Sequence, residues 1–174
     1  MSKVKNLKEL LSVSEPYKKR RKILLGILDE VLLDVNPEKL VSNALPHVSG
    51  EVYVVSVGKA AYPMTKATCG ALKVREGIMI VPKGKKVPKI PGLKTFYASH
   101  PIPDANGKKA SQALVEFASK LSEKDHVIFL LSGGGSALLP LPVKGICMKK
   151  KAKITSDLIK RGATINEINT VRKH

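Results

Sequence analysis

The sequence contains few aromatic residues, few cysteines and no long apolar run. Tryptophan is absent and aromatic residues make up 4% of the 174 residues, so a core must be built from Leu, Ile, Val and Ala. The only cysteines, Cys69 and Cys147, do not form a disulfide framework or a metal site by spacing, which is typical of a reducing compartment. No apolar stretch approaches the roughly 18 residues that cross a bilayer, and the charged first residues show no secretory signal. We therefore expect a cytoplasmic protein that neither spans nor binds a membrane.

Three familiar kinds of site are also missing. No G-x-G-x-x-G follows the first expected strand, which argues against a dinucleotide site, and Leu138 stands where a G-x-S-x-G nucleophile elbow requires glycine. The histidines are scattered and show no metal-ligand spacing; they are His47, His100, His126 and His174. We expect no metal-ligating residues in this chain.

Basic residues outnumber acidic ones and give the chain a formal charge of +17. The densest basic clusters lie at 18–22 and 149–151, with further lysines between 83 and 89. Such a charge is typical of proteins that bind nucleic acids or anionic substrates. The clusters lack interleaved aromatic residues for base stacking, and no helix-turn-helix, zinc or RNP pattern is present. We therefore favour a lysine-rich solvated surface and do not expect nucleic acid as a partner.

Apolar periodicity predicts two helices at the start of the chain, followed by alternating strands and helices. The apolar stripe from Ile23 to Leu32 predicts a helix over about 15–34, and Asn36 as N-cap with Pro37 predicts a short helix to about Leu45. Strands are expected at 51–57, 77–81, 93–98 and 127–131; helices are expected at 60–73, after Asp104, at 152–160 and from the capping box 164–167. This order predicts a three-layer α/β fold with a mostly parallel sheet, helices on both faces and an N-terminal helix pair.

The expected domain organisation has two parts. Residues 1–48 form a helical segment that we expect to pack on the α/β domain of residues 49–174. The sequence stops at His174 inside the last expected helix, without the glycine or polar tail that usually ends a domain. We therefore expect the α/β domain to be incomplete and the chain to be the front part of a longer protein.

The segment 127–139 carries the strongest functional signal. Five consecutive apolar residues, 127–131, predict a strand that is buried on both faces and runs directly into three glycines. Glycines at a strand end can adopt positive φ, and their N–H groups can form an anion nest at the carboxyl edge of a parallel sheet. The alternative is a flexible glycine-rich turn. The predicted ligand loop consists of Ser132, Gly133, Gly134, Gly135 and Ser136.

Lys59 follows an expected strand end and Gly58, and it opens a helix. From that position its ammonium group can neutralise an anionic ligand or a transferring phosphoryl group. The spacing G-x-x-x-x-G-K-[ST] of a Walker A loop is absent. The alternative for a single lysine is an ordinary surface charge.

Two other segments contain candidate ligand contacts. In 99–107, His100 and Asp104 suit ligand contacts and equally suit a turn followed by an N-cap, so both interpretations stay open. Near the end of the sequence, Asn169, Arg172 and His174 can share one side of a helix and suit a carboxylate or phosphate. The alternative for these three residues is a solvated helix face.

Four segments, taken in order, resemble the glycerate 2-kinases that have a Rossmann-like first domain. The segments are Val-Gly-Lys-Ala-Ala at 57–61, Ser-His-Pro-Ile-Pro-Asp at 99–104, Leu-Ser-Gly-Gly-Gly-Ser-Ala-Leu at 131–138 and Ile-Asn-Thr-Val-Arg-Lys-His at 168–174. The resemblance covers almost the whole chain. It implies ATP- and Mg²⁺-dependent phosphorylation of D-glycerate to 2-phosphoglycerate, in a cleft between two domains.

The same resemblance implies roles for individual residues. Lys59 matches the family's active-site lysine, and residues 132–136 match its glycine-rich ligand loop. Asn169, Arg172 and His174 match positions that help line the cleft. Family members are much longer than this chain, so the carboxyl-terminal domain and its catalytic residues are absent here, and the truncated chain is expected to be inactive alone. A homodimer or a separate chain can supply the missing domain.

One departure from the family and two other functions are kept open. The segment 145–151 is more basic than the family's pattern. One alternative function is a non-catalytic basic α/β module that binds nucleic acid or a partner protein. The other is a hydroxypyruvate reductase, which the absent dinucleotide motif disfavours.

Overall fold

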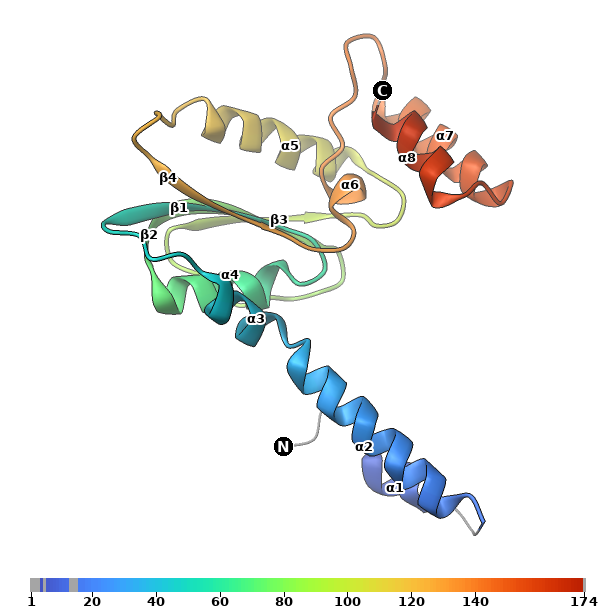
Figure 1. Ribbon diagram of the computed structural model, residues 1–174. Helices are drawn as coiled ribbons and strands as arrows, with labels where there is room; N and C mark the ends of the chain where they lie inside the picture. Colours follow the sequence, from blue (N-terminus) through green and yellow to red (C-terminus); the bar gives the residue numbers. More distant parts are fainter. Residues whose placement is uncertain (1–3, 5, 13–15, 174) are drawn as a thin grey trace. The chain divides into compact units, whose positions relative to one another are not determined.

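The computed structural model describes residues 4, 6–12 and 16–173, and the chain divides into two units, Met1–Leu45 and Pro46–His174. The first unit contains three helices among its described residues: α1 Leu7–Leu11, α2 Lys18–Asp34 and α3 Pro37–Ala44 (Figure 1). The two predicted helices are therefore present, while α1 was not predicted. The expected start of α2 near 15 lies outside the described residues.

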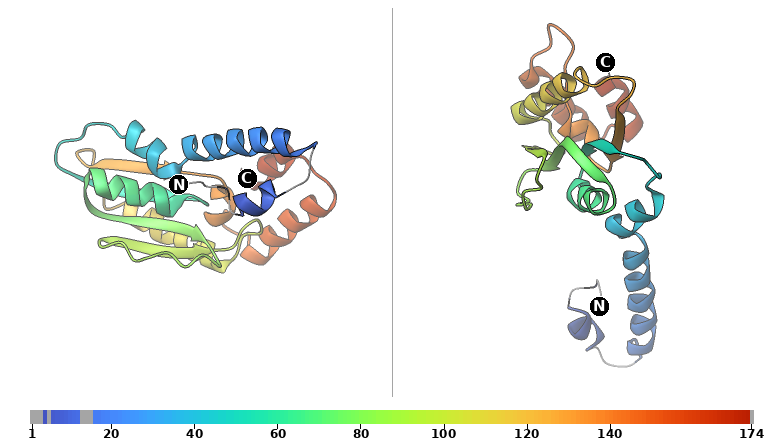
Figure 2. Two further views of the ribbon diagram at one scale, coloured as in Figure 1. Left: turned by 90° about the horizontal axis from the view of Figure 1, so that it is seen from below. Right: turned by 90° about the vertical axis from the view of Figure 1, so that its left-hand side faces the viewer.

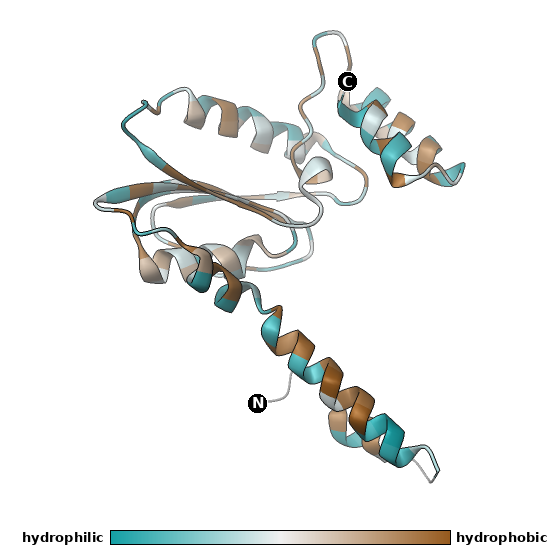
Figure 3. Ribbon diagram, in the orientation of Figure 1, coloured by the Kyte–Doolittle hydropathy of each residue, from teal (hydrophilic) through white to brown (hydrophobic). Residues whose placement is uncertain are grey.

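Local chemistry explains where α3 begins. The side chain of Asn36 accepts a hydrogen bond from the backbone N–H of Glu38 at 2.9 Å, and Pro37 occupies the first helical turn. Proline is tolerated there because its missing N–H would have no intrahelical partner. Apolar residues recur along α2, as the hydropathy colours of Figure 3 show. The Asn-Pro pair thus separates α2 from α3.

The second unit is a parallel α/β sheet. Its described strands, in the order β3-β2-β1-β4, are β1 Glu51–Val57, β2 Lys73–Pro82, β3 Leu93–Ala98 and β4 His126–Leu131. Its described helices are α4 Ala61–Ala71, α5 Ala105–Ala118, α6 Gly135–Leu138, α7 Met148–Lys160 and α8 Ile165–Lys173. This confirms the predicted α/β class with a parallel sheet; β2 and α7 begin earlier than expected, and the single turn α6 was not predicted.

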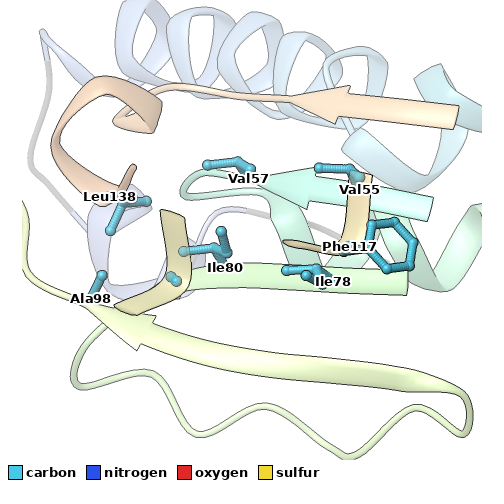
Figure 4. Close-up of a cluster of buried hydrophobic side chains, with 8 residues drawn as sticks. Val55, Val57, Ile78, Ile80, Ala98, Phe117 and Leu138 are labelled. Carbon is cyan, nitrogen blue, oxygen red and sulfur yellow. The ribbon is translucent and has the colours of Figure 1, made fainter. Parts of the chain in front are cut away.

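Helices cover both faces of the sheet. Figures 1 and 2 place α4 on one face and α5 with α6 on the other. Because side chains alternate along a strand, Val55 and Val57 point to the α5 side together with Ile78 and Ile80 of β2. Figure 4 shows these four residues gathered with Phe117, Ala98 and Leu138. The opposite face packs Met79 and Val81 against Ala61 at the start of α4.

The expectation that strand 127–131 is buried on both faces is wrong. Leu130 is 6% exposed, but Val127, Phe129 and Leu131 are 41%, 54% and 62% exposed. Phe129 and Leu131 pair in register with Val55 and Val57, so they point to the α5 side of the sheet. The α5 helix packs mainly on β3, at the opposite edge, and does not cover β4. The apolar run therefore reflects one buried face and one face left open in the described part of the chain.

Two predicted helix starts are confirmed in atomic detail. Asp104 accepts a hydrogen bond from Gly107 N–H at 2.9 Å and caps α5. Thr164 and Glu167 form the capping box before α8: the Glu167 carboxylate accepts from the Thr164 N–H at 2.7 Å. No helix within the described ranges is both long and apolar enough to span a bilayer.

Candidate functional site

The candidate site lies at the edge of the sheet where the parallel strands end. Strands β1, β3 and β4 lead directly into Gly58, Ser99 and Ser132, respectively. Since parallel strands present all their carboxyl ends at one edge, the loops that follow them meet there. The sequence segments 58–60, 99–104 and 132–136 are therefore brought to one side of the second unit.

Four hydrogen bonds join the end of β1 and the loop that follows it to the loop after β4. The backbone N–H of Lys59 donates to the carbonyl of Gly133 at 3.0 Å. The Ser132 hydroxyl accepts from the N–H of Ala60 at 3.0 Å and donates to the carbonyl of Val57 at 3.2 Å, and the Ser132 N–H donates to that same carbonyl at 2.9 Å. Lys59 and the glycine loop are thereby held side by side. The Ser132 hydroxyl is used within the protein, so this residue positions the loop.

The three glycines of the loop differ in conformation. Gly134 has φ of 96°, whereas Gly133 and Gly135 do not have positive φ, so one glycine of the three needs the left-handed region. A Cβ on Gly134 would lie 2.8 Å from Cδ2 of His100, while a Cβ on Gly133 would meet nothing within 4 Å. In the described part of the chain, the N–H groups of Gly133 and Gly134 donate to no acceptor. These two backbone donors are therefore not used by the described chain.

His100 connects the glycine loop to the cationic residues around it. Its ring lies against Gly134. Desolvation first, and then the positive charges of Lys59 and Arg172, lower the pKa of His100 below its ordinary value of 6.5. The imidazole is therefore neutral at neutral pH and has one donor and one acceptor nitrogen. Lys59 and Arg172 belong to two different segments, and the charge of each acts on the pKa of His100.

Lysines of the loop after β2 also reach this edge. Lys85 Nζ donates to the backbone carbonyl of Lys59 at 3.2 Å, and Lys83 forms an ion pair with Asp104. Burial opposes ionisation of Asp104, but hydrogen bonds from Lys83, Gly107 and Ser99 outweigh it and lower the pKa of Asp104 to about 2. Asp104 therefore acts as an N-cap and loop tie. Sequence reasoning missed Lys85; its position three residues after the end of β2 is the signal that would have identified it.

The residues at this edge do not fit a magnesium ion. Mg²⁺ is usually bound through carboxylates together with substrate phosphates. Among segments 58–60, 83–85, 99–104 and 132–136, Asp104 supplies the sole carboxylate, and its oxygens already accept from Lys83, Ser99 and Gly107. Across the residues that the structure describes, no group of three or more His, Cys, Asp or Glu side chains could hold a metal ion.

The third predicted group of ligand residues lies on α8. Asn169 is half-buried, and so is Arg172 three residues later. The carbonyl of Arg172 accepts a hydrogen bond from Lys151 Nζ of α7 at 3.0 Å, so α7 and α8 are tied together at this point. His174 lies outside the described residues. The structure thus places Lys59 beside the glycine loop, and the charges of Lys59 and Arg172 both act on His100. Asn169 has no polar partner among the described residues.

Sequence comparisons connect this chain to proteins of known activity. Residues 23–174 match the profile of a family described as a domain of unknown function, DUF4147. The chain is 40% identical over 157 residues to a D-glycerate 2-kinase of Thermotoga maritima and 36% identical over 169 residues to a glycerate 2-kinase of Pyrococcus horikoshii. Each match covers 88% of this chain and 38% of the relative. The chain therefore corresponds to an N-terminal part of these proteins.

Solved structures and a differently named relative complete the comparison. A crystal structure of Thermotoga maritima glycerate kinase superposes with a TM-score of 0.80 at 39% identity, over 90% of this chain and 39% of that chain. A crystal structure of a Pyrococcus horikoshii protein gives a TM-score of 0.76 at 36% identity, over 89% of this chain and 38% of that chain. A protein of Agrobacterium vitis, provisionally named hydroxypyruvate reductase, is 36% identical over 157 residues, covering 88% of this chain and 36% of its own length.

Proposed function

Because this chain belongs to the DUF4147 family, and within it resembles an N-terminal part of the glycerate 2-kinases, we propose that it is the front portion of a glycerate 2-kinase. The complete protein would transfer a phosphoryl group from ATP to D-glycerate and release 2-phosphoglycerate. The carrying observation is the pair of hydrogen-bonded loops that hold Lys59 beside Gly133 at the carboxyl edge of the sheet. This is the edge at which open α/β sheets bind their ligands.

The chemistry of phosphoryl transfer suits this arrangement. The transferring group needs positioning and neutralisation of charge, and little covalent help from the protein. Lys59 is exposed at the edge, so its ammonium group is available to a phosphate or carboxylate oxygen. The N–H groups of Gly133 and Gly134 would hold a second oxygen by preorganised donors. Gly135 and Ser136 open α6 beside them and complete the proposed loop.

The other predicted residues have supporting roles in this proposal. Ser132 would orient the loop through its hydrogen bonds to Val57 and Ala60. Asn169, Arg172 and His174 would face the glycerate side of the cleft; His174 enters only by sequence. The rest of the site would come from the part of the glycerate 2-kinases that this chain does not span, supplied by a longer chain, a partner chain or a homodimer.

Mg²⁺ remains part of the proposal through the nucleotide and not through this chain. The edge provides no free carboxylate, so the described residues of this chain would contribute no ligand to the ion. Its ligands would be the phosphates of ATP and groups of the absent portion. We also retain the prediction of a cytoplasmic location for the complete enzyme.

The experiment compares the chain alone with a completed protein. Purified chain, ATP, Mg²⁺ and D-glycerate should give no 2-phosphoglycerate, because the chain spans 38% of the glycerate 2-kinases that it matches. A joined protein, made of residues 1–174 followed by the remaining segment of the Thermotoga maritima relative, should form 2-phosphoglycerate. Turnover of roughly 1–100 per second by the chain alone would show that its site is complete and the proposal of a partial site wrong.

Two control measurements separate the alternatives. Circular dichroism checks that the joined protein is folded. If the folded joined protein forms no 2-phosphoglycerate, the proposal that it is a glycerate kinase is wrong. Oxidation of NADH or NADPH with hydroxypyruvate would instead support the reductase named for the Agrobacterium vitis relative. Binding of DNA or RNA that falls steeply with salt, with no response to ATP or glycerate, would support a nucleic-acid module.

A further inference from the structure

A small pocket lies between α7, α8 and the segment that leads into α7. Its volume is about 70 Å³. Most of its wall is apolar and is formed by Pro142, Val143, Ile146, Ile154 and Val171. Two cationic side chains, Lys151 and Arg172, complete the lining together with Thr155. The pocket is therefore an apolar recess with positive charge at one side.

Arg172 has buried donors that nothing in the described chain satisfies. Its Nε and Nη2 atoms are buried and have no hydrogen-bond partner among the described residues. Burial lowers the pKa of the Arg172 guanidinium, but an arginine stays protonated under physiological conditions. A buried charge without a partner is unfavourable because it loses its hydration and gains nothing in return. The guanidinium thus keeps two N–H donors for an acceptor that the described part of the chain does not supply.

Lys151 adds a second positive charge to the same pocket. Its Nζ atom donates to the Arg172 carbonyl at 3.0 Å, which uses one of its three N–H donors. Burial, and then the charge of Arg172, lower the pKa of the Lys151 ammonium. No ion pair of either residue with a carboxylate is present among the described residues. Two like charges in one recess repel each other unless an anion lies between them.

We propose that this pocket is a subsite for a small carboxylate, held by the Arg172 guanidinium and the Lys151 ammonium with its carbon atoms against the apolar wall. A planar guanidinium pairs with a carboxylate through two parallel hydrogen bonds. A phosphate has its own candidate donors at Lys59 and the glycine loop, so we assign the carboxylate to this pocket. The inference rests on the proposed function in one respect, namely that D-glycerate is the carboxylate to test first.

The test is to titrate the 174-residue chain with D-glycerate or with glycerol. Binding is measured by calorimetry and by the NMR signal of the Arg172 Nε–H group. D-Glycerate should shift this signal to saturation, whereas glycerol, which has the hydroxyls without the carboxylate, should not. Lys151→Met should weaken glycerate binding about tenfold, the effect of losing one charge-assisted hydrogen bond. Lys149→Met removes an exposed lysine of the same helix and should change the affinity less than twofold.

Three results would reject the carboxylate subsite. If Lys151→Met and Lys149→Met lose the same amount of affinity for glycerate, glycerate is attracted by the overall charge of the chain, and the subsite is rejected. An Arg172 signal that does not respond to glycerate would also reject it, and so would stronger binding of inorganic phosphate than of glycerate. Thermal unfolding of each variant keeps misfolding apart from lost binding, with Lys151→Gln as a second substitution.

Failure of the kinase and failure of the subsite give different results. If glycerate binds at Arg172 but the joined protein forms no 2-phosphoglycerate, the kinase proposal alone is wrong. If the joined protein is active and Lys151→Met leaves its KM for glycerate unchanged, the subsite alone is wrong. A rise in KM with little change in kcat is the result expected for a residue that holds the substrate equally in the ground and transition states.

Discussion

Gly58 lies directly against Ser132. A Cβ on Gly58 would be 2.2 Å from the Ser132 hydroxyl oxygen and 2.5 Å from its carbonyl oxygen, distances that a real Cβ does not adopt. Gly58 also has φ of 126°, which L side chains rarely adopt. The close approach of the loops after β1 and β4 therefore depends on a missing side chain. Without that approach, Lys59 could not donate to Gly133.

Gly58→Ala is expected to cost about 3 kcal/mol or more in free energy of unfolding, because it adds steric overlap to backbone strain. Gly84→Ala is the matched control: Gly84 has φ of 85° and open space around its Cβ position, so it should lose only about 1–2 kcal/mol. Urea unfolding measures both. Equal losses would show that the contact with Ser132 contributes nothing. Ser132→Ala should not rescue Gly58→Ala, since the carbonyl oxygen remains.

Gly134→Val should destabilise the loop by about 1–3 kcal/mol and weaken ATP binding in the joined protein. The physical reasons are its φ of 96° and the 2.8 Å approach of a new Cβ to His100. Gly133→Ala meets no neighbour and should be tolerated, and Ser136→Ala should be mild because the amide donors remain. Calorimetry of ATP against the three variants compares them. If a folded Gly134→Val variant binds ATP as tightly as wild type, the loop only connects β4 to α6 and does not bind the ligand.

Lys59→Ala should leave the fold intact and lower turnover of the joined enzyme by on the order of 10² or more, through lost stabilisation of charge. The side chain is exposed, so its removal sacrifices little packing. Lys109→Ala, which removes an exposed lysine of α5, serves as the control and should keep wild-type kinetics. Steady-state kinetics and circular dichroism test both halves. Near wild-type turnover in Lys59→Ala would make Lys59 an ordinary surface charge.

Asp104→Asn should reduce stability at pH 7 by roughly 2 kcal/mol, following the lowering of the Asp104 pKa from 3.8 to about 2. A carboxylate whose pKa is lower in the folded state stabilises it above the unfolded pKa. The difference between wild type and variant should therefore be constant above about pH 5 and shrink as the pH falls toward 2. Asparagine remains a good N-cap, so the substitution isolates the charge. A difference that does not change with pH would assign the effect to packing.

The parts of the fold that could be predicted were those set by local sequence. The β3 bounds, the Asp104 cap and the Thr164–Glu167 capping box depend on neighbouring residues and were found. The helix α1 has five residues, too few for an apolar period to be recognised. The exposure of Phe129 could not be predicted, because a run of apolar residues does not say which strand ends the sheet.

The candidate site was predictable by residue type and not by contact. Lys59 and the glycine loop were named as candidates because glycines after a strand signal a ligand edge. The structure places them side by side, and their role in ligand binding stays a prediction. The hydrogen bond from Ala60 to the Ser132 hydroxyl joins residues 72 positions apart, and no local pattern encodes it. The same is true of Lys151, which is one of many lysines in the sequence and is singled out only by its bond to Arg172.

The open face of β4 suggests a second role for the chain's large positive charge, namely protection against aggregation. Copies of the chain carry apolar side chains at an edge strand, a combination that favours sheet-to-sheet aggregation. A formal charge of +17 opposes that aggregation by mutual repulsion over distances comparable to the Debye length, about 10 Å at 0.1 M salt. Added salt should therefore make the isolated chain less soluble. Nucleic-acid binding would weaken under the same conditions, so one salt series reports on the colloidal role of the lysines and on the rival function at once.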